Sequence, residues 1–244
     1  MQSFTDDLRQ ALARLDPRAA PQVVLVRRAP WGITAPHQRL GVFSASFNPP
    51  HNAHVEMMRL AQQKFNLDEM LLLLAKANVD KEEFGATLEQ RLTMMLGIAA
   101  EHPDYSVAAV SHGRFVDKAI ALREVYPDGT AIYFLLGYDT LVRLFDPKYY
   151  ADMPTELTRL FSMAQFIAAN RQEHGIEEIR QLLMRAEVRP FAHQIHPLAL
   201  DDVHAHLSST EVRRRVAAHE PYEHLVPPTV AAFIRQAKLY LFPA

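Results

Sequence analysis

The chain has 244 residues, of which 49% are hydrophobic and 22% are charged, as is usual for a globular protein. Its 26 basic and 28 acidic residues nearly balance, so no overall charge favours nucleic acid or an acidic membrane as a partner. The absence of cysteine excludes disulfides, thiolate metal sites and a cysteine nucleophile. Residues 1–16 lack the apolar stretch of a secretory signal, and the longest apolar run, 70–75, is too short to cross a bilayer. We therefore expect a soluble, cytoplasmic protein with no nucleic-acid or membrane partner.

Short runs typical of strands alternate along the chain with longer patterns typical of helices. The expected strands are 23–27, 40–46, 69–75, 105–110, 130–137, 164–170 and 191–198, and the expected helices are 3–15, 52–66, 87–102, 114–126, 138–145, 174–186, 209–219 and 227–239. Several strands are apolar at nearly every residue, which indicates that both of their faces are covered. The alternation predicts an α/β fold, with a doubly wound, mainly parallel Rossmann-like sheet and helices on both faces.

The sequence also suggests how the chain is divided. Residues 29–38 form a connector that contains proline, glycine and threonine. We expect residues 1–38 to be an N-terminal extension packed on the main domain, and residues 39–244 to form that domain. The one tryptophan, Trp31, lies in the connector and is expected to anchor its packing.

The first chemically informative stretch is SFNPPHNAH, residues 46–54. The two prolines fix the direction of the chain after a strand, and a helix is expected to begin near Asn52. His51 and His54 are three residues apart, so both rings can face the helix N-terminus, where free N–H groups and the helix dipole attract anions. The pair is also compatible with surface polarity or helix capping. A metal site is disfavoured, because no third ligand lies nearby in the sequence.

The second stretch is HLSSTEVRRRV, residues 206–216. Ser208 and Glu211 have the spacing of a capping box at a helix start. In addition, the Ser209 and Thr210 hydroxyls and the guanidinium of Arg213 would converge on the same helix end, where they could hold a phosphate. The capping and phosphate-binding interpretations both remain open from the residues alone.

Taken together, GVFSASFNPPHNAH and LSSTEVR resemble the two motifs of the HxGH nucleotidyltransferase superfamily, approximately GxFxPxHxGH and ISSTxxR. Within it, the stretches 77–95 and 134–150 and the residues 167–171 make the chain most similar to a divergent branch of the nicotinamide/nicotinate mononucleotide adenylyltransferases. The resemblance covers roughly residues 40–216. It implies a nucleotidyltransferase that moves AMP from ATP to a pyridine mononucleotide, in NAD biosynthesis. Mg²⁺ would be held mainly by the ATP phosphates.

The resemblance also implies roles for individual residues. The expected catalytic residues are His51, His54 and Arg213, and no protein metal ligands are expected. The ATP-binding residues would be Ser46, Phe47, Asn48, Gly137, Asp139, Ser208, Ser209 and Thr210. Lys81, Arg91 and Arg171 would lie near the acceptor. Other interpretations remain for three of these: Lys81 as a solubilising loop residue, Arg91 as part of a surface ion pair, and Asp139 as a helix N-cap.

Two departures from the family pattern bear on the site. Ala53 stands where the family motif has glycine, and no tryptophan follows the GxD match at Gly137, so Phe145, Tyr149 or Tyr150 would have to supply a stacking face. Alternative functions are transfer of a nucleotidyl group to another phosphate ester, such as phosphopantetheine or glycerol phosphate, or nucleotide binding without catalysis. The sequence leaves open the amide or carboxylate form of the pyridine acceptor and the oligomeric state.

Overall fold

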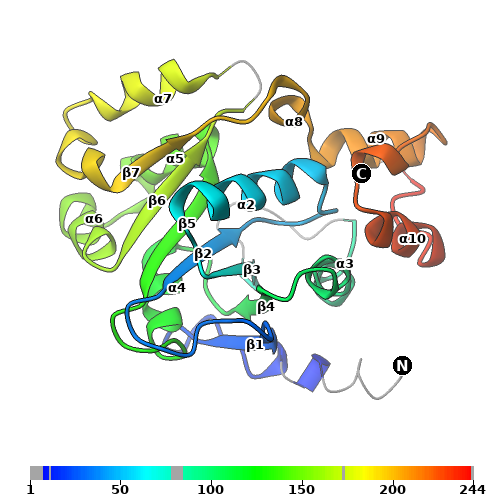
Figure 1. The fold of residues 1–244 in the computed structure, drawn as a ribbon, viewed down its shortest axis with the longest axis horizontal. Coiled ribbons are helices and arrows are strands. Elements are labelled where there is room, and N and C mark those ends of the chain that lie inside the picture. Colours follow the sequence, from blue (N-terminus) through cyan, green and yellow to red (C-terminus); the bar gives the residue numbers. More distant parts are fainter. Residues whose placement is uncertain (1–7, 11, 78–84, 172–173, 243–244) are drawn as a thin grey trace.

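The computed structural model describes residues 8–10, 12–77, 85–171 and 174–242. They form a seven-stranded sheet with the strand order β1-β4-β3-β2-β5-β6-β7 (Figure 1). The strands are β1 Val23–Arg27, β2 Arg39–Ser44, β3 Glu69–Ala75, β4 Tyr105–Val110, β5 Ala131–Gly137, β6 Ala164–Ala169 and β7 Ile195–Leu198. All neighbouring pairs are parallel except β1 with β4, which is antiparallel. The predicted α/β architecture is confirmed.

The helices cover both faces of this sheet. They are α2 Asn52–Phe65, α3 Leu88–Ala100, α4 Phe115–Arg123, α5 Tyr138–Leu144, α6 Met153–Phe161, α7 Ile176–Leu183, α8 Asp202–His206, α9 Ser209–Ala217 and α10 Pro228–Gln236. The 3₁₀ turns of the described part of the chain are η1 Pro147–Tyr149, η2 Arg189–Gln194 and η3 Glu223–Leu225. In the described ranges, no helix combines the length and the apolarity that spanning a bilayer requires.

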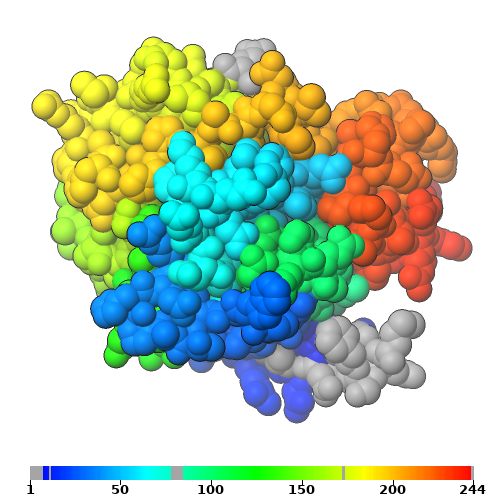
Figure 2. Space-filling view, in the orientation of Figure 1, coloured from blue at the N-terminus to red at the C-terminus, as the bar shows by residue number. Residues whose placement is uncertain are grey.

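Side-chain alternation along the strands divides the interior into two cores. In β3, Met70, Leu72 and Leu74 face one core, together with apolar residues of α2, α3, α9 and α10. Leu71 and Leu73 face the other, with residues of α4, α5, α6 and α7. This period of two is the pattern of a strand buried on both sides. The C-terminal segment, orange to red, lies against α2 and α3 in the space-filling view (Figure 2).

Three elements differ from expectation. The expected strand at 191–198 begins as η2, and β7 starts at Ile195. The helix α6 was not predicted, although Asp152 caps it by accepting a hydrogen bond from the Thr155 N–H at 3.3 Å, and a proline follows the cap. The five-residue helix α8 is too short to show a helical period.

The described part of residues 1–38 contacts the sheet at its β4 edge. β1 extends the sheet there, while Leu12 and Leu15 are buried in the core that contains α3. The Lys76 ammonium donates to the carbonyl oxygens of both leucines, at 3.0 and 2.7 Å. The boundary at residue 38 stays a prediction. The expectation for Trp31 is wrong: its side chain is 75% exposed, because the connector runs along the surface and is anchored by Ile33 instead.

Glu69, at the start of β3, is a fully buried carboxylate that binds the segment before β2 and the segment before β5 to the sheet. Its Oε2 accepts from the Ile33 N–H at 2.6 Å, and its Oε1 accepts from the Tyr126 hydroxyl at 2.5 Å. Gly32 is required beside it, since a Cβ there would stand 2.6 Å from Glu69 Oε2. A buried carboxylate is stabilised only when such donors satisfy it.

Replacing Glu69 with glutamine is therefore expected to destabilise the fold. The amide NH₂ group cannot accept, so one of the two donors loses its partner, at a cost of about 1–3 kcal/mol in the free energy of unfolding. Denaturant-induced unfolding measures the change, with Glu124→Gln at an exposed position of the same chemistry as control. Equal stability of the two variants would contradict this account of Glu69.

Candidate active site

A cavity of about 410 Å³ opens at the carboxyl ends of the central strands. The strand order reverses between β2 and β5, because β3 and β4 lie on one side of β2 while β5, β6 and β7 lie on the other. Parallel sheets bind ligands at this kind of reversal. Residues at or just after the ends of β2, β3, β5 and β6 line the cavity, among them Ser46, Ala75, Gly137 and Arg171.

One wall of the cavity is the start of α2. His51 is the extended residue that precedes the helix, with φ −141° and ψ 171°, and the first turn contains no acidic side chain. The rings of His51 and His54 stack, with their centres 3.6 Å apart. Both histidines and Ala53 line the cavity. Free N–H groups, the positive end of the helix dipole and two imidazoles thus meet at one point, which favours an anion there.

A backbone hydrogen bond sets the protonation of His54. The His51 N–H donates to His54 Nδ1 at 3.1 Å, so Nδ1 accepts and the proton of the neutral ring sits on Nε2. Edge contacts from Phe43 and Phe47 hold the ring, each with its centre 5.3 Å from the imidazole. The Nε2–H is therefore left as a fixed donor. His51 Nδ1 is buried and lacks a hydrogen-bond partner among the described residues.

Both histidines are held in the neutral form. Burial, then the positive charges of Arg171 and His204, lowers the pKa of His51 from 6.5 to about 3. The pKa of His54 is well below its usual value because of burial, followed by the electrostatic effects of the neighbouring His51 and Arg171, which disfavour a second proton in the pair. Neutral rings at pH 7 can donate a hydrogen bond without adding charge to the cavity.

These shifts predict that stability falls in mild acid. In the unfolded chain both histidines bind protons below about pH 6.5, whereas in the folded chain they stay neutral. The contribution of the two neutral rings to the free energy of unfolding is therefore present in full above pH 6.5. It is lost as the pH falls toward the lowered pKa of each ring, which is about 3 for His51, by up to about 1.4 kcal/mol per pH unit for each histidine. Unfolding curves at pH 7.5 and 5.5 measure this change. The free energy of unfolding should fall less between these pH values in a His51→Asn, His54→Asn double variant than in the native chain. His193→Asn, at an exposed position, is the control; a loss identical to that of the native chain in the double variant would refute the assignment.

The other part of this wall is the start of α9. Ser208 caps the helix by accepting from the Glu211 N–H at 3.2 Å. The Ser209 hydroxyl donates to the carbonyl oxygen of Pro49 at 2.8 Å, and Arg213 Nη1 donates to that of Asn48 at 2.7 Å. Arg213 Nη2 also contacts the Thr210 hydroxyl, at 3.2 Å. The two motifs found in the sequence are thus joined directly, and Ser208, Ser209, Thr210 and Arg213 line the cavity.

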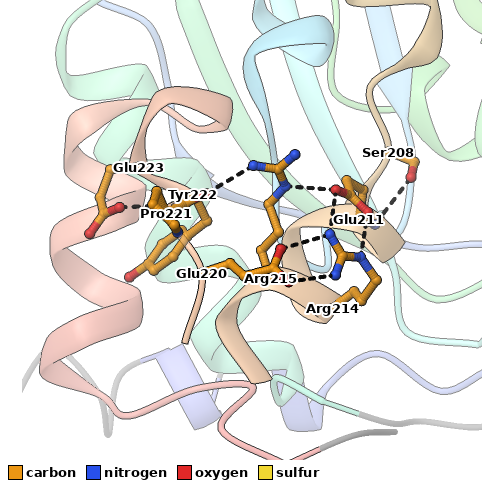
Figure 3. A network of polar contacts seen from close by, with 8 residues as sticks. All are labelled: Ser208, Glu211, Arg214, Arg215, Glu220, Pro221, Tyr222 and Glu223. Carbon is orange, nitrogen blue, oxygen red and sulfur yellow. Dashed lines mark hydrogen bonds and ion pairs between the residues drawn. The ribbon is translucent and has the colours of Figure 1, made fainter. Parts of the chain in front are cut away.

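The expected capping box at α9 is half formed. The Glu211 carboxylate does not return to the helix start but binds Arg214 and Arg215, with closest distances of 2.8 and 2.6 Å, because two guanidinium groups attract it more strongly than a neutral N–H (Figure 3). Arg214 also pairs with Glu220 at 2.9 Å (Figure 3). Of the three consecutive arginines, Arg213 lines the cavity, whereas Arg214 and Arg215 are absent from its lining and both bind Glu211 (Figure 3).

The loop between β2 and α2 is supported from two distant segments. Asn48 Oδ1 accepts from the Ala86 N–H at 3.2 Å and from the Tyr240 hydroxyl at 2.8 Å. Arg91 is buried in the cavity wall and donates to the carbonyl oxygen of Ser46 at 3.4 Å, so its interpretation as a surface ion pair is wrong. The nonlocal support from Tyr240 was not predicted.

Some predicted residues lie away from the cavity surface. The Phe47 side chain is fully buried in a core, with its backbone at φ 45°. Asp139 is exposed and absent from the cavity lining, and Gly137 rather than Asp139 precedes α5, so the N-cap interpretation is wrong. Phe145 packs in the other core, which leaves Tyr149 and Tyr150 as aromatic residues at the cavity. Lys81 lies outside the described residues.

The cavity is locally basic although the chain carries a net charge of −2. Among the described residues, one carboxylate lines it, that of Glu156, which is ion-paired with Arg114 at 2.7 Å. The lining cations are Arg91, Arg114, Lys118, Arg143, Arg171 and Arg213. His204, bound to Asp201 at 2.8 Å, adds a further imidazole. Such a surplus of donors suits a polyanionic ligand. Arg114, Lys118, Arg143 and His204 were not predicted, since none of them lies in either of the two phosphate-binding motifs.

Comparisons with known proteins agree with this geometry. The family model described as cytidylyltransferase-like matches residues 42–215, a range that begins in β2 and ends in α9. The chain belongs to the cytidylyltransferase-like family. The resemblance indicated by the two motifs is confirmed.

Several relatives of this cytidylyltransferase-like chain have named activities. It is 32% identical over 219 residues to a Chromobacterium violaceum protein named "Probable nicotinate-nucleotide adenylyltransferase", covering 83% of this chain and 98% of the relative. It is 30% identical to a Schizosaccharomyces pombe protein provisionally named as a nicotinamide mononucleotide adenylyltransferase, covering 82% and 85%. The solved structure of the Plasmodium falciparum nicotinic acid mononucleotide adenylyltransferase complexed with NaAD has the same fold, with a TM-score of 0.66 at 16% identity, covering 85% and 99%.

Proposed function

We propose that this protein transfers AMP from ATP to nicotinate or nicotinamide mononucleotide, forming a dinucleotide and releasing pyrophosphate. The observation that carries the proposal is the joining of two helix starts over the cavity, through the contacts of Ser209 with Pro49 and of Arg213 with Asn48. This arrangement brings the His51–His54 pair and Arg213 to one basic site of a size suited to a small ligand. The names of the relatives supply the acceptor class.

The proposed reaction is a direct attack of the acceptor phosphate on the α-phosphate of ATP. A phosphate monoester is already anionic at neutral pH, so no general base is needed. Catalysis then consists of positioning the two reactants and stabilising the charge that builds on the α-phosphate and on the leaving pyrophosphate. In this assignment the Nε2–H of His54 and the ring of His51 face the α-phosphate. Arg213, Ser208, Ser209 and Thr210 bind the β- and γ-phosphates.

The remaining predicted residues take supporting roles in the proposal. Ser46 and Asn48 contact the nucleotide from the loop before α2, Phe47 through its main chain, and Gly137 admits it at the end of β5. Arg91 and Arg171, both in the cavity lining, bind the acceptor. Asp139 is not assigned a contact.

Magnesium enters this proposal as part of the substrate, bound to ATP. No group of three histidine, aspartate or glutamate side chains suited to a metal is found among the described residues. The carboxylate of Glu156, which lines the cavity, is ion-paired with Arg114. Triphosphate oxygens and water are therefore the expected ligands of Mg²⁺, as is common for this ion.

A panel of acceptors tests the proposal. Pyrophosphate release is measured with Mg²⁺ and either ATP or CTP, in the presence of nicotinate mononucleotide, nicotinamide mononucleotide, phosphopantetheine or glycerol phosphate. The proposal predicts release that requires ATP and one of the pyridine mononucleotides. Pyrophosphate release with another acceptor, or release with CTP but not with ATP, would indicate a different transfer reaction. ATP binding without release from any pair would indicate nucleotide binding without catalysis.

A further inference from the structure

Lys118 is a buried lysine of α4 that lines the cavity. Its ammonium nitrogen lies 4.7 Å from the centre of the Phe115 ring. Among the described residues, it has no hydrogen-bond acceptor and no carboxylate partner. Asp117, whose charge acts on Lys118, and Glu156, the carboxylate that lines the same cavity, are both paired with Arg114, at 3.1 and 2.7 Å. The ammonium group of Lys118 is therefore available to bind a ligand in the cavity.

A buried ammonium group without an ion-pair partner lowers the stability of the fold. Burial lowers the pKa of Lys118 from 10.5 to about 8, against an opposing effect of Asp117. The amine is still mostly protonated at neutral pH, so the fold holds a desolvated positive charge that forms no ion pair with any described residue. A buried charge is normally paired, and an unpaired one in a cavity marks a candidate binding position.

The position of Lys118 separates it from the phosphate-binding wall. His54 and Arg213 come from α2 and α9, whose apolar residues pack in the core on one face of the sheet. Lys118 comes from α4, which packs in the core on the other face with α5 and α6. Phe115 and Tyr150 lie on the same side as Lys118 and line the cavity with it. This second wall thus offers aromatic faces for a ring and one cation beside them.

We propose that Lys118 selects an acceptor whose aromatic ring carries a carboxylate, so that nicotinate mononucleotide is preferred over nicotinamide mononucleotide. The inference rests on the proposed function. With the reacting phosphates at the wall of His54 and Arg213, the pyridine end of the acceptor is the part that reaches the second wall. Adenine is neutral and gives an ammonium group no anion to bind.

The hydrogen-bonding chemistry of the ammonium group distinguishes nicotinate mononucleotide from nicotinamide mononucleotide. It donates hydrogen bonds and accepts none. A carboxylate offers it two anionic acceptor oxygens, while a carboxamide offers one neutral oxygen and an NH₂ group that would repel it. The same residue therefore attracts one acceptor and disfavours the other, as selective sites commonly do.

The test compares Lys118→Met with the native chain. Methionine has a similar length and removes a buried charge, so the variant is expected to fold, and its melting temperature checks this. Calorimetry measures the binding of each mononucleotide, and initial rates with ATP give kcat/KM for each. Lys64→Met, an exposed lysine at the end of α2, is the matched control.

The native chain should bind nicotinate mononucleotide more tightly than the amide, and Lys118→Met should weaken that binding about tenfold to a hundredfold. Binding of nicotinamide mononucleotide and the KM for ATP should change less than about threefold. Equal losses for both acceptors, an unchanged preference, or a native preference for the amide would overturn the inference while leaving the proposed function standing. A native chain that binds neither mononucleotide would overturn both.

Discussion

His54→Ala is expected to lower kcat about a hundredfold while leaving the fold intact. The Nδ1 of this ring accepts from the His51 N–H at 3.1 Å, and Phe43 and Phe47 hold the ring from its edges. The Nε2–H is thus a donor fixed before the substrate arrives. In the proposed function it meets the charge that develops on the α-phosphate, where removing one donor typically costs about 3 kcal/mol.

The assignment of His54 is checked by initial rates at saturating ATP and acceptor. His193→Ala, at an exposed position away from the cavity, should keep the native rate. A folded His54→Ala protein that turns over at the native rate would remove this residue from the mechanism. His51→Ala is also expected to weaken ATP binding or turnover.

Arg213→Gln is expected to reduce kcat/KM for ATP about a hundredfold to a thousandfold. Its guanidinium reaches from α9 to the carbonyl oxygen of Asn48 at 2.7 Å and faces the cavity. The substitution removes a charged donor for the leaving pyrophosphate and also the link between α9 and the loop before α2. Steady-state rates over a range of ATP concentrations measure the effect.

The next residue in the sequence provides a matched control for Arg213. Arg214 has the same side chain in the same helix, but it does not line the cavity and pairs with Glu211 and Glu220 (Figure 3). Arg214→Gln should change kcat/KM by less than about threefold and the free energy of unfolding by about 1 kcal/mol or less, since exposed ion pairs contribute little. Equal losses of activity in the two variants would contradict the assignment of Arg213.

The fold could be predicted largely from the sequence because its determinants are local. The strands β3 and β4 are apolar at nearly every residue, and the helical patterns lie between strands, so the α/β alternation follows directly. The position of β1, antiparallel beside β4, depends on pairs of residues that lie 80 to 87 positions apart in the chain, which no local pattern specifies. The helix α6 had a readable cap in Asp152 and was missed although the signal was present.

The site was predictable where it lies in short motifs. His51, His54, Ser209 and Arg213 sit at helix starts that the sequence marks, and the structure brings them to one cavity. Tyr240 supports Asn48 across 192 positions of the chain, and such a contact leaves no trace in a local pattern.

The sequence pattern of α4 contains a weaker signal for Lys118. It lies three residues after Phe115 and four before Leu122, so it stands in the apolar stripe of α4 where a further apolar side chain would be expected. A lysine at such a position is either a defect in the helix pattern or a residue that faces a cavity.

The measurement that tests the account most directly is the mass of the product formed from ATP, Mg²⁺ and nicotinate mononucleotide by the native chain. The account predicts a dinucleotide that contains both adenine and nicotinate, with one pyrophosphate released for each dinucleotide formed. Bound ATP that yields no dinucleotide, or that yields AMP or ADP with the mononucleotide unchanged, would contradict it.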